Sequence, residues 1–172
     1  MLKRVLDPCS IIRVQSWDIE AIVPSTVEDI LGVAWPQQTG TVASGPASVI
    51  CVGPTDWLIV AADRDAAPWL QRLEQLFQGS SFRATDVSQA LTSIEIGSSV
   101  SRDLLAKACS LDLHPPLFPP GRSARTRFAG MPVIVRCTGT SKFELVVAQS
   151  YADYLLCWLT DAAIEFSNPQ PA

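Results

Sequence analysis

The residues best suited to chemistry lie close together, between positions 112 and 122. Asp112 offers a carboxylate. His114, the only histidine of the chain, has an imidazole, a type of side chain that can act as an acid or a base. No Ser/His/Asp or Cys/His set can be assembled around this one histidine. Beside Pro115 and Pro116, we expect His114 to make loop hydrogen bonds or to contact a partner. We therefore predict no catalytic residue in this chain.

The segment HPPLFPPG, residues 114 to 121, has a backbone restricted by proline. Proline lacks an N–H donor, so the segment is expected to be neither helix nor central strand, but extended and stiff. A stiff segment loses little entropy on docking, which suits a partner surface. The segment could equally fold back over its own hairpin. The candidate partner interface consists of Asp112, His114, Leu117, Phe118 and Arg122, with Leu117 and Phe118 as its apolar anchors.

Five cysteines form an odd set without CxxC spacing. A zinc site needs clustered ligands, and the chain has only one histidine to add to these cysteines, so we predict no metal site. The thiols are expected to be buried as small hydrophobic groups. They belong to Cys9, Cys51, Cys109, Cys137 and Cys157.

Three further polar features have simple structural interpretations. Gly97-Ser98-Ser99 follows an expected strand but lacks the glycines of a GxGxxG loop, so no flavin or NAD site is predicted on this chain. Asp86 and Ser88 suit a turn before a strand. Arg102 is expected on the polar face of a helix, either solvated or paired across an interface.

The charge of the chain narrows the classes of partner. The net charge is −4, and no block of Lys or Arg could neutralise a phosphate backbone, so a nucleic-acid partner is not expected. No apolar h-region follows Lys3 and Arg4, and no apolar run approaches the roughly 20 residues that span a bilayer. We therefore expect no signal peptide, no membrane contact and a cytoplasmic location. Only 17% of the residues are charged, which favours apolar surface that a permanent protein partner would cover.

One segment of the sequence occurs twice. Sliding the chain by 86 residues aligns PASVICVGPTDWLIVAADRDAAPWLQRL, residues 46 to 73, with PVIVRCTGTSKFELVVAQSYADYLLCWL, residues 132 to 159. Apolar alternation on both sides of a four-residue turn predicts a hairpin in each copy, and a helix-period stripe follows each hairpin. The identical pairs are Pro46/Pro132, Val49/Val135, Cys51/Cys137, Gly53/Gly139, Val60/Val146, Ala62/Ala148, Ala66/Ala152, Leu70/Leu156 and Leu73/Leu159.

Each hairpin is preceded by a strand and a helix. SIIRVQSW and LTSIEIGS read as the strands, and TVEDILGVAW and SVSRDLLAKAC as the helices. The motifs DIL (29–31) and DLL (103–105) correspond at an offset of 74, so we expect about twelve additional residues in the proline-rich stretch of the second half. The predicted fold is α+β, a single domain over residues 1–172 made of two pseudo-symmetric β-α-β-β-α halves, at about 10–80 and 85–167.

The stretch TDVSQALTSIEIGSSVSRDLLAKACSLDLHPPLFPPGRSARTRF, residues 85 to 128, resembles the gamma subunit of heterotetrameric sarcosine oxidase. The likeness continues through FELVVAQSYADYLLCWLTDAAIEF at residues 143 to 166, and GPTDWLIVA fits it earlier in the chain. That family is in turn similar to the folate-binding fold of aminomethyltransferase, the T protein of glycine cleavage. The resemblance implies a small subunit that is non-catalytic alone, in a complex that oxidises sarcosine to glycine with one-carbon transfer to tetrahydrofolate.

The resemblance also implies where the cofactors and partners lie. FAD, FMN, NAD, folate and zinc are expected on the partner subunits, and none on this chain. The partners are the alpha, beta and delta subunits, chiefly the large alpha subunit. The alternative is a free-standing folate-binding protein similar to aminomethyltransferase. In that case Asp112 could orient a folate-bound carbon unit, although a carboxylate there could also simply anchor the loop before Pro115.

Overall fold

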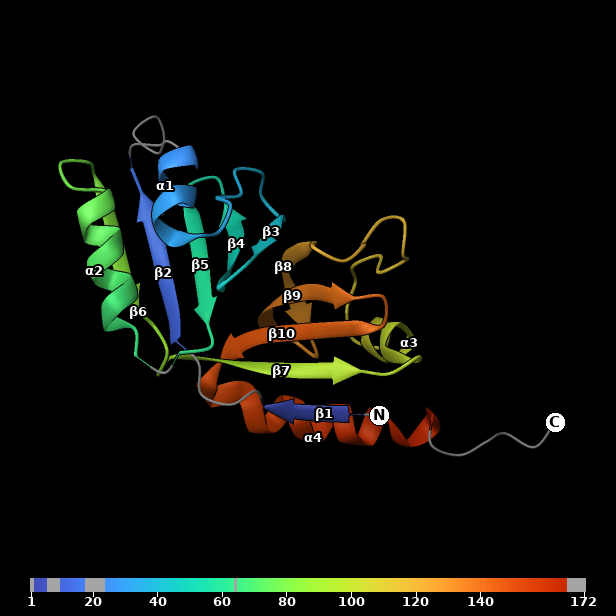
Figure 1. Ribbon diagram of the computed structural model, residues 1–172. Coiled ribbons are helices and arrows are strands. Elements are labelled where there is room, and N and C mark those ends of the chain that lie inside the picture. The colour runs from blue at the N-terminus through green and yellow to red at the C-terminus, as the bar shows by residue number, and fades with distance from the viewer. Residues whose placement is uncertain (1, 6–9, 18–23, 64, 167–172) are drawn as a thin grey trace. The chain divides into compact units, whose positions relative to one another are not determined.

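The computed structural model describes residues 2–5, 10–17, 24–63 and 65–166. The chain forms two compact units: residues Asp7–Leu91 make one, and Met1–Leu6 together with Thr92–Ala172 make the other. Each unit contains a five-stranded antiparallel sheet and two α-helices, so the fold is mixed α and β, as the sequence predicts (Figure 1). No helix in the described residues is long and apolar enough to cross a membrane.

The unit of residues Asp7–Leu91 has the strand order β3-β4-β5-β2-β6. Apolar side chains from one face of this sheet pack against both helices, with Trp57, Ile59 and Leu73 almost fully buried. The strands are β2 (Ser10–Ser16), β3 (Val42–Ser44), β4 (Ala47–Gly53), β5 (Asp56–Ala61) and β6 (Phe82–Asp86), and the helices are α1 (Pro24–Leu31) and α2 (Ala67–Leu76).

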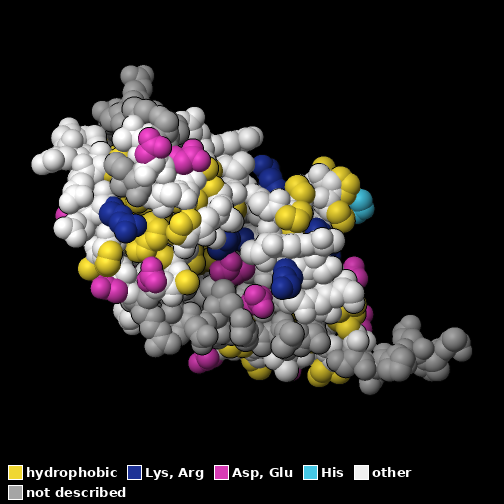
Figure 2. Space-filling model, viewed as in Figure 1, with side chains coloured by type: hydrophobic (Ala, Val, Ile, Leu, Met, Phe, Trp, Pro, Cys, Tyr) yellow, Lys and Arg dark blue, Asp and Glu magenta, His cyan; other side chains and the backbone are white. Residues whose placement is uncertain are grey.

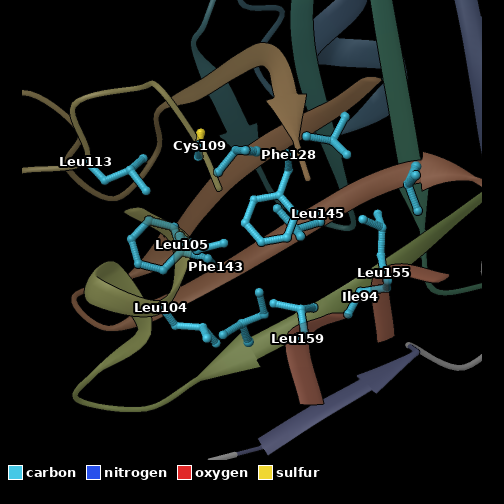
Figure 3. Close-up of a cluster of buried hydrophobic side chains, with 14 of the residues drawn as sticks. Ile94, Leu104, Leu105, Cys109, Leu113, Phe128, Phe143, Leu145, Leu155 and Leu159 are labelled. Atoms are coloured by element: carbon cyan, nitrogen blue, oxygen red, sulfur yellow. The ribbon is translucent and has the colours of Figure 1, made fainter. Parts of the chain in front are cut away.

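The second unit has the strand order β1-β7-β10-β9-β8. Its core joins the sheet to both helices through side chains such as Phe143, Leu105 and Leu155, each fully buried (Figure 3). The strands are β1 (Leu2–Val5), β7 (Leu91–Gly97), β8 (Ser123–Phe128), β9 (Met131–Gly139) and β10 (Lys142–Ala148). The helices are α3 (Ser101–Ala106) and α4 (Ala152–Ala162), with 3-10 turns η1 (Gln149–Tyr151) and η2 (Ile164–Phe166) beside α4.

The two predicted hairpins are present and have matching registers. In the first, Cys51 of β4 lies opposite Trp57 of β5, and Gly53 lies opposite Asp56. In the second, Cys137 of β9 lies opposite Phe143 of β10, and Gly139 lies opposite Lys142. Both pairings contain a register irregularity beside the turn. Every pair therefore keeps the offset of 86 found in the sequence.

The order of elements departs from the predicted β-α-β-β-α. Each unit has a third strand between its first helix and its hairpin, which is β3 in one unit and β8 in the other. Each sheet also has an edge strand beside its first long strand. This edge strand is β6, paired with β2, in one unit and β1, paired with β7, in the other. The short or charged edge strands lack the strong apolar alternation that a core strand shows.

The sequence predicts that the roughly twelve additional residues of the second unit lie together in the proline-rich stretch, but in the structure they are divided between two places. Gly40 and Gly121 have φ values of 85° and 84°, and each donates its N–H to the carbonyl of Cys51 or Cys137 at 2.9 Å. These two glycines therefore occupy equivalent places, 81 positions apart. The offset rises from 74 at α1 and α3 to 81 at the glycines and 86 at the cysteines, so seven additional residues precede Gly121 and five follow it.

Candidate partner-binding loop

The proline-rich stretch forms a loop that leaves α3 and enters β8, and it is fixed at both ends. Near its start, Cys109 forms an isolated antiparallel bridge with Phe128. Near its end, Gly121 donates its N–H to the carbonyl of Cys137, and the Cys137 N–H donates to the carbonyl of Arg122, both at 2.9 Å. The loop therefore continues the sheet hydrogen bonding at β9 before β8 begins.

Two apolar side chains anchor the middle of the loop in the core of its own unit. Leu113 and Phe118 are each only 5% exposed and belong to the same cluster as Leu105 and Phe143. Phe118 was expected as an anchor for a partner, and this is wrong, because its side chain completes the hydrophobic core of its own chain. In part, then, the segment folds back over its own hairpin.

Arg102 of α3 donates hydrogen bonds to the backbone of the loop. Its Nη1 donates to the carbonyl of Leu113 and, at 3.3 Å, to the carbonyl of Phe118. Its Nη2 donates at 3.2 Å to the carbonyl of Thr140 in the β9–β10 turn. The guanidinium carbon lies 4.9 Å from the centre of the Phe143 ring, a cation–π geometry. The expectation of a solvated or interface-paired Arg102 is therefore wrong, since one side chain joins the helix, the loop and the turn.

Asp112 and His114 shape the exposed end of the loop. The Asp112 carboxylate accepts the backbone N–H of His114 at 2.9 Å. The His114 carbonyl in turn accepts the N–H groups of Leu117 and Phe118, both at 2.9 Å. Asp112 thus anchors the loop ahead of Pro115, which is one of the two roles that the sequence left open.

The turn leaves Leu117 61% exposed, while Asp112 and His114 are also exposed and Arg122 is half-buried. Figure 2 shows the histidine, in cyan, beside hydrophobic side chains. Of the five predicted interface residues, the structure leaves four at the surface and takes Phe118 into the core. Their contact with a partner stays a prediction.

Asp86 and Ser88 form the expected turn before β7. Ser88 donates its N–H to the Asp86 carboxylate at 2.9 Å, and the Ser88 hydroxyl accepts the N–H of Ile11 at 2.9 Å. These side chains close the connection between β6 and β7 and tie it to β2. They act as structural residues within their own unit.

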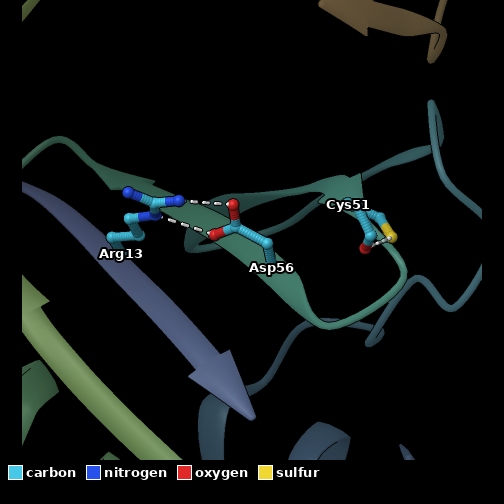
Figure 4. Close-up of polar contacts among 4 residues, drawn as sticks. Arg13, Cys51 and Asp56 are labelled. Carbon is cyan, nitrogen blue, oxygen red and sulfur yellow. Dashed lines mark hydrogen bonds and ion pairs between the residues drawn. The ribbon is translucent and has the colours of Figure 1, made fainter. Parts of the chain in front are cut away.

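The described cysteines follow the buried-thiol interpretation with one exception. Cys51, Cys109 and Cys137 are buried, whereas Cys157 on α4 is exposed; Cys9 lies outside the described residues. Burial raises the pKa of the Cys51 thiol, which donates to the carbonyl of Gly53 at 3.3 Å (Figure 4). Within the described part of the chain, no three His, Cys, Asp or Glu side chains form a cluster that could hold a metal ion.

The ion pairs of the described residues, which include an exposed one between Lys107 and Glu165, were not predicted. Arg13 of β2 binds Asp56 of β5 with two hydrogen bonds of 2.9 and 2.7 Å, and this bonding raises the pKa of Arg13 (Figure 4). Arg136 of β9 binds Glu144 of β10 at 2.8 Å with both side chains buried, and Ser93 donates its hydroxyl to the same carboxylate. The hairpin register could have revealed this pair, since both charges interrupt apolar strands at opposed positions.

Comparison with solved structures identifies the class of fold. A chain of the heterotetrameric sarcosine oxidase from Corynebacterium sp. U-96, in complex with pyrrole 2-carboxylate, matches with a TM-score of 0.87 at 24% identity, over 99% of this chain and 87% of that chain. The glycine cleavage system aminomethyltransferase T from Bartonella henselae matches with a TM-score of 0.64 at 14% identity, over 91% of this chain and 44% of that chain. The chain therefore has an aminomethyltransferase-like fold.

Sequence comparison identifies the family. The model of the family described as "Sarcosine oxidase, gamma subunit family" matches residues 18–165. The sarcosine oxidase subunit gamma of Corynebacterium sp. strain U-96 is 30% identical over 144 residues, which cover 82% of this chain and 69% of that protein. The subunit gamma of Arthrobacter sp. is 28% identical over 144 residues, covering 83% and 70%. This chain belongs to the sarcosine oxidase gamma subunit family.

Proposed function

We propose that the chain is the gamma subunit of a sarcosine oxidase complex and assembles with alpha, beta and delta subunits, chiefly the large alpha subunit. The observation that carries the proposal is the family match, which spans residues 18–165 and so includes the whole loop and both hairpins. The fold shared with a chain of a heterotetrameric oxidase supports it over 99% of this chain.

The chain's own part in the complex is structural. Its loop is built by hydrogen bonds between side chains and the loop backbone and by core packing, rather than around a reactive group. Asp112 and His114, the two side chains best suited to chemistry, hold the loop through the Asp112 carboxylate and the His114 backbone. FAD, FMN, NAD, folate and zinc then belong to the partner subunits, and oxidation of sarcosine to glycine takes place there.

A reconstitution experiment tests this division of labour. The partner subunits are expressed with and without this chain, and sarcosine oxidation, complex mass and flavin content are measured for both preparations. The proposal predicts that the isolated chain neither oxidises sarcosine nor carries flavin, and that omitting it lowers the yield of assembled complex. Sarcosine oxidation by the isolated chain would contradict it.

The alternative is a free-standing folate-binding protein, favoured by the fold shared with aminomethyltransferase T over 91% of this chain. That match covers only 44% of the aminomethyltransferase, and the Asp112 carboxylate already binds the loop backbone. Titration of the isolated chain with tetrahydrofolate, followed by tryptophan fluorescence, separates the two proposals. Saturable binding at micromolar concentration would favour the alternative.

We also infer that the two units are pseudo-symmetric copies of one β-β-α-β-β-β-α repeat, with the first strands β1 and β6 exchanged between them. The matching strand orders and the equivalent places of Gly40 and Gly121 support this inference. A cytoplasmic location of the complex stays a prediction.

A further inference from the structure

We propose that residues 114 to 120, here named the docking tip, insert Leu117 into an uncharged, apolar recess of a partner subunit, and that Arg102 is the positioning residue that holds the tip ready for docking. This inference rests on the proposed function and deepens it, because it specifies the contact surface and the chemistry that the partner must offer.

The backbone donors of the docking tip are already used within the chain. The N–H of His114 binds the Asp112 carboxylate, and the N–H groups of Leu117 and Phe118 both bind the His114 carbonyl. The other four residues of the tip are prolines, which have no N–H. Because these donors are paired within the chain, an apolar partner that covers this surface leaves none of the tip's N–H groups unsatisfied, and the Phe118 and Pro119 carbonyls also already accept hydrogen bonds from Arg102 and Arg122.

Apart from the His114 imidazole, the side chains of the docking tip are apolar, and they favour an apolar partner surface as the backbone does. Between Asp112 and Arg122 the sequence has no Asp, Glu, Lys or Arg. Leu117 is 61% exposed, and the four prolines around it are exposed as well. A tip without free backbone donors cannot extend a sheet edge as a full strand, and this tip contains no Lys or Arg, the side chains that most often bind anions. Apolar insertion of Leu117 is the mode of recognition that this composition favours.

The docking tip is held in one shape from inside the chain. Leu113 and Phe118 fix its two sides in the core, and Arg102 binds the carbonyls of both residues. Arg102 also binds the carbonyl of Thr140, so the tip is tied to the β9–β10 turn. A segment that is ordered before it binds loses less conformational entropy on binding. The free energy gained by burying Leu117 is therefore not offset by the cost of ordering the tip, and the affinity is higher.

The first experiment compares two exposed apolar residues of the same unit. Leu117→Ser is measured beside Ile164→Ser, since Ile164 on η2 is 60% exposed and forms a matched control. Affinity for the co-expressed partner subunits is measured by biolayer interferometry on the full chain. We expect Leu117→Ser to weaken binding by about tenfold or more, whereas Leu117→Met, which keeps an apolar side chain, should retain most of the affinity. We expect Ile164→Ser to bind as the unchanged chain does.

The second experiment separates positioning from stability. Arg102→Lys keeps the charge but loses the planar fork that reaches several carbonyls at once. Under conditions where circular dichroism shows an intact fold, we expect faster amide hydrogen exchange at Leu117 and Phe118 and binding weakened about threefold to tenfold. The variant Arg102→Lys/Leu117→Ser should bind no more weakly than Leu117→Ser alone, because positioning matters only when the anchor is present.

The outcomes are distinguishable from failure of the proposed function. If the unchanged chain binds its partners and Leu117→Ser binds equally well, the docking tip is refuted while the gamma-subunit proposal stands. If Arg102→Lys accelerates exchange at the tip without weakening binding, the positioning role is refuted. If the unchanged chain does not bind the partner subunits at all, the proposed function and this inference both fail.

Discussion

Arg136 and Glu144 face each other across β9 and β10, with Nη1 and Oε2 2.8 Å apart and both side chains less than a tenth exposed. Ser93 donates its hydroxyl to the same carboxylate, whereas Arg136 Nε has no hydrogen-bond partner among the described residues. A buried ion pair of this kind is costly to break from one side, because the remaining charge stays buried without its partner.

Removal of one member of this pair should therefore destabilise the chain strongly. We expect Arg136→Met to lower the free energy of unfolding by about 3–5 kcal/mol, and Arg136→Met/Glu144→Leu to lower it by less than the single change. Lys107→Met is the control in an exposed ion pair, since the side chains of Lys107 and Glu165 are 35% and 67% exposed, and its loss should cost about 1 kcal/mol or less. Urea unfolding measures all three, and a double variant less stable than the single variant would contradict the account.

The buried thiols should be protected from alkylation. We expect iodoacetamide at pH 8 to label Cys157 in the native chain and to reach Cys51, Cys109 and Cys137 only after unfolding. Peptide mass spectrometry of native and urea-treated samples gives the readout. Rapid native labelling of Cys137 would show that the β9–β10 hairpin opens.

The Cys51 thiol should also give stability a dependence on alkaline pH. Burial raises its pKa above the ordinary value of about 9, so the native chain holds this proton more tightly than the unfolded chain does. The contribution is fully present below pH 9 and is lost as the pH rises through the native pKa. Urea midpoints from pH 7 to 10.5 should decline above about pH 9, and less steeply in Cys51→Ala.

The β8–β9 turn contains a residue with unfavourable backbone geometry. Ala129 has a φ of 49° and Gly130 a φ of 84°, and a Cβ added at Gly130 would meet nothing within 4 Å. Ala129→Gly should relieve the left-handed conformation and raise stability by up to about 1 kcal/mol, whereas Gly130→Ala should lower it by about 1 kcal/mol. Thermal unfolding of both variants tests this, and a lower melting temperature for Ala129→Gly would contradict it.

Neighbouring residues of the loop should respond in opposite ways. Phe118→Ala removes a core side chain and should cost about 3–5 kcal/mol, while Leu117→Ala should change the stability of the isolated chain by no more than about 0.5 kcal/mol. Urea unfolding of the isolated chain separates them. Equal midpoints for Phe118→Ala and the unchanged chain would show that Phe118 is not a core residue.

The hairpins were predictable because apolar alternation and turn residues are local signals. Cys51 and Cys137 align in the sequence and occupy the same place in the two units. The edge strand β8 was not predicted, because its exposed Arg125 and Arg127 replace the apolar alternation that marks a buried strand. An edge strand is recognised by the strand with which it pairs, and a local sequence pattern does not show which strand that is.

The loop shows a different limit of sequence reasoning. The sequence places Leu117 and Phe118 side by side but does not say which of the two turns inward, because a single turn in the backbone decides it. Arg102 gave no signal at all, since it binds backbone carbonyls 11, 16 and 38 residues further along the chain. Every residue has a backbone carbonyl that can accept a hydrogen bond, so the residue type does not show which carbonyls Arg102 will bind.

The most direct test of the central claim is the state of this chain in its native host. The chain is tagged, purified under mild conditions and analysed by native mass spectrometry, and the same sample is assayed for sarcosine oxidation. The account predicts a complex that contains flavin, oxidises sarcosine and holds one copy of this chain together with three other subunits of different mass. A chain recovered alone, from cells whose oxidase assembles with full activity when this chain is deleted, would contradict it.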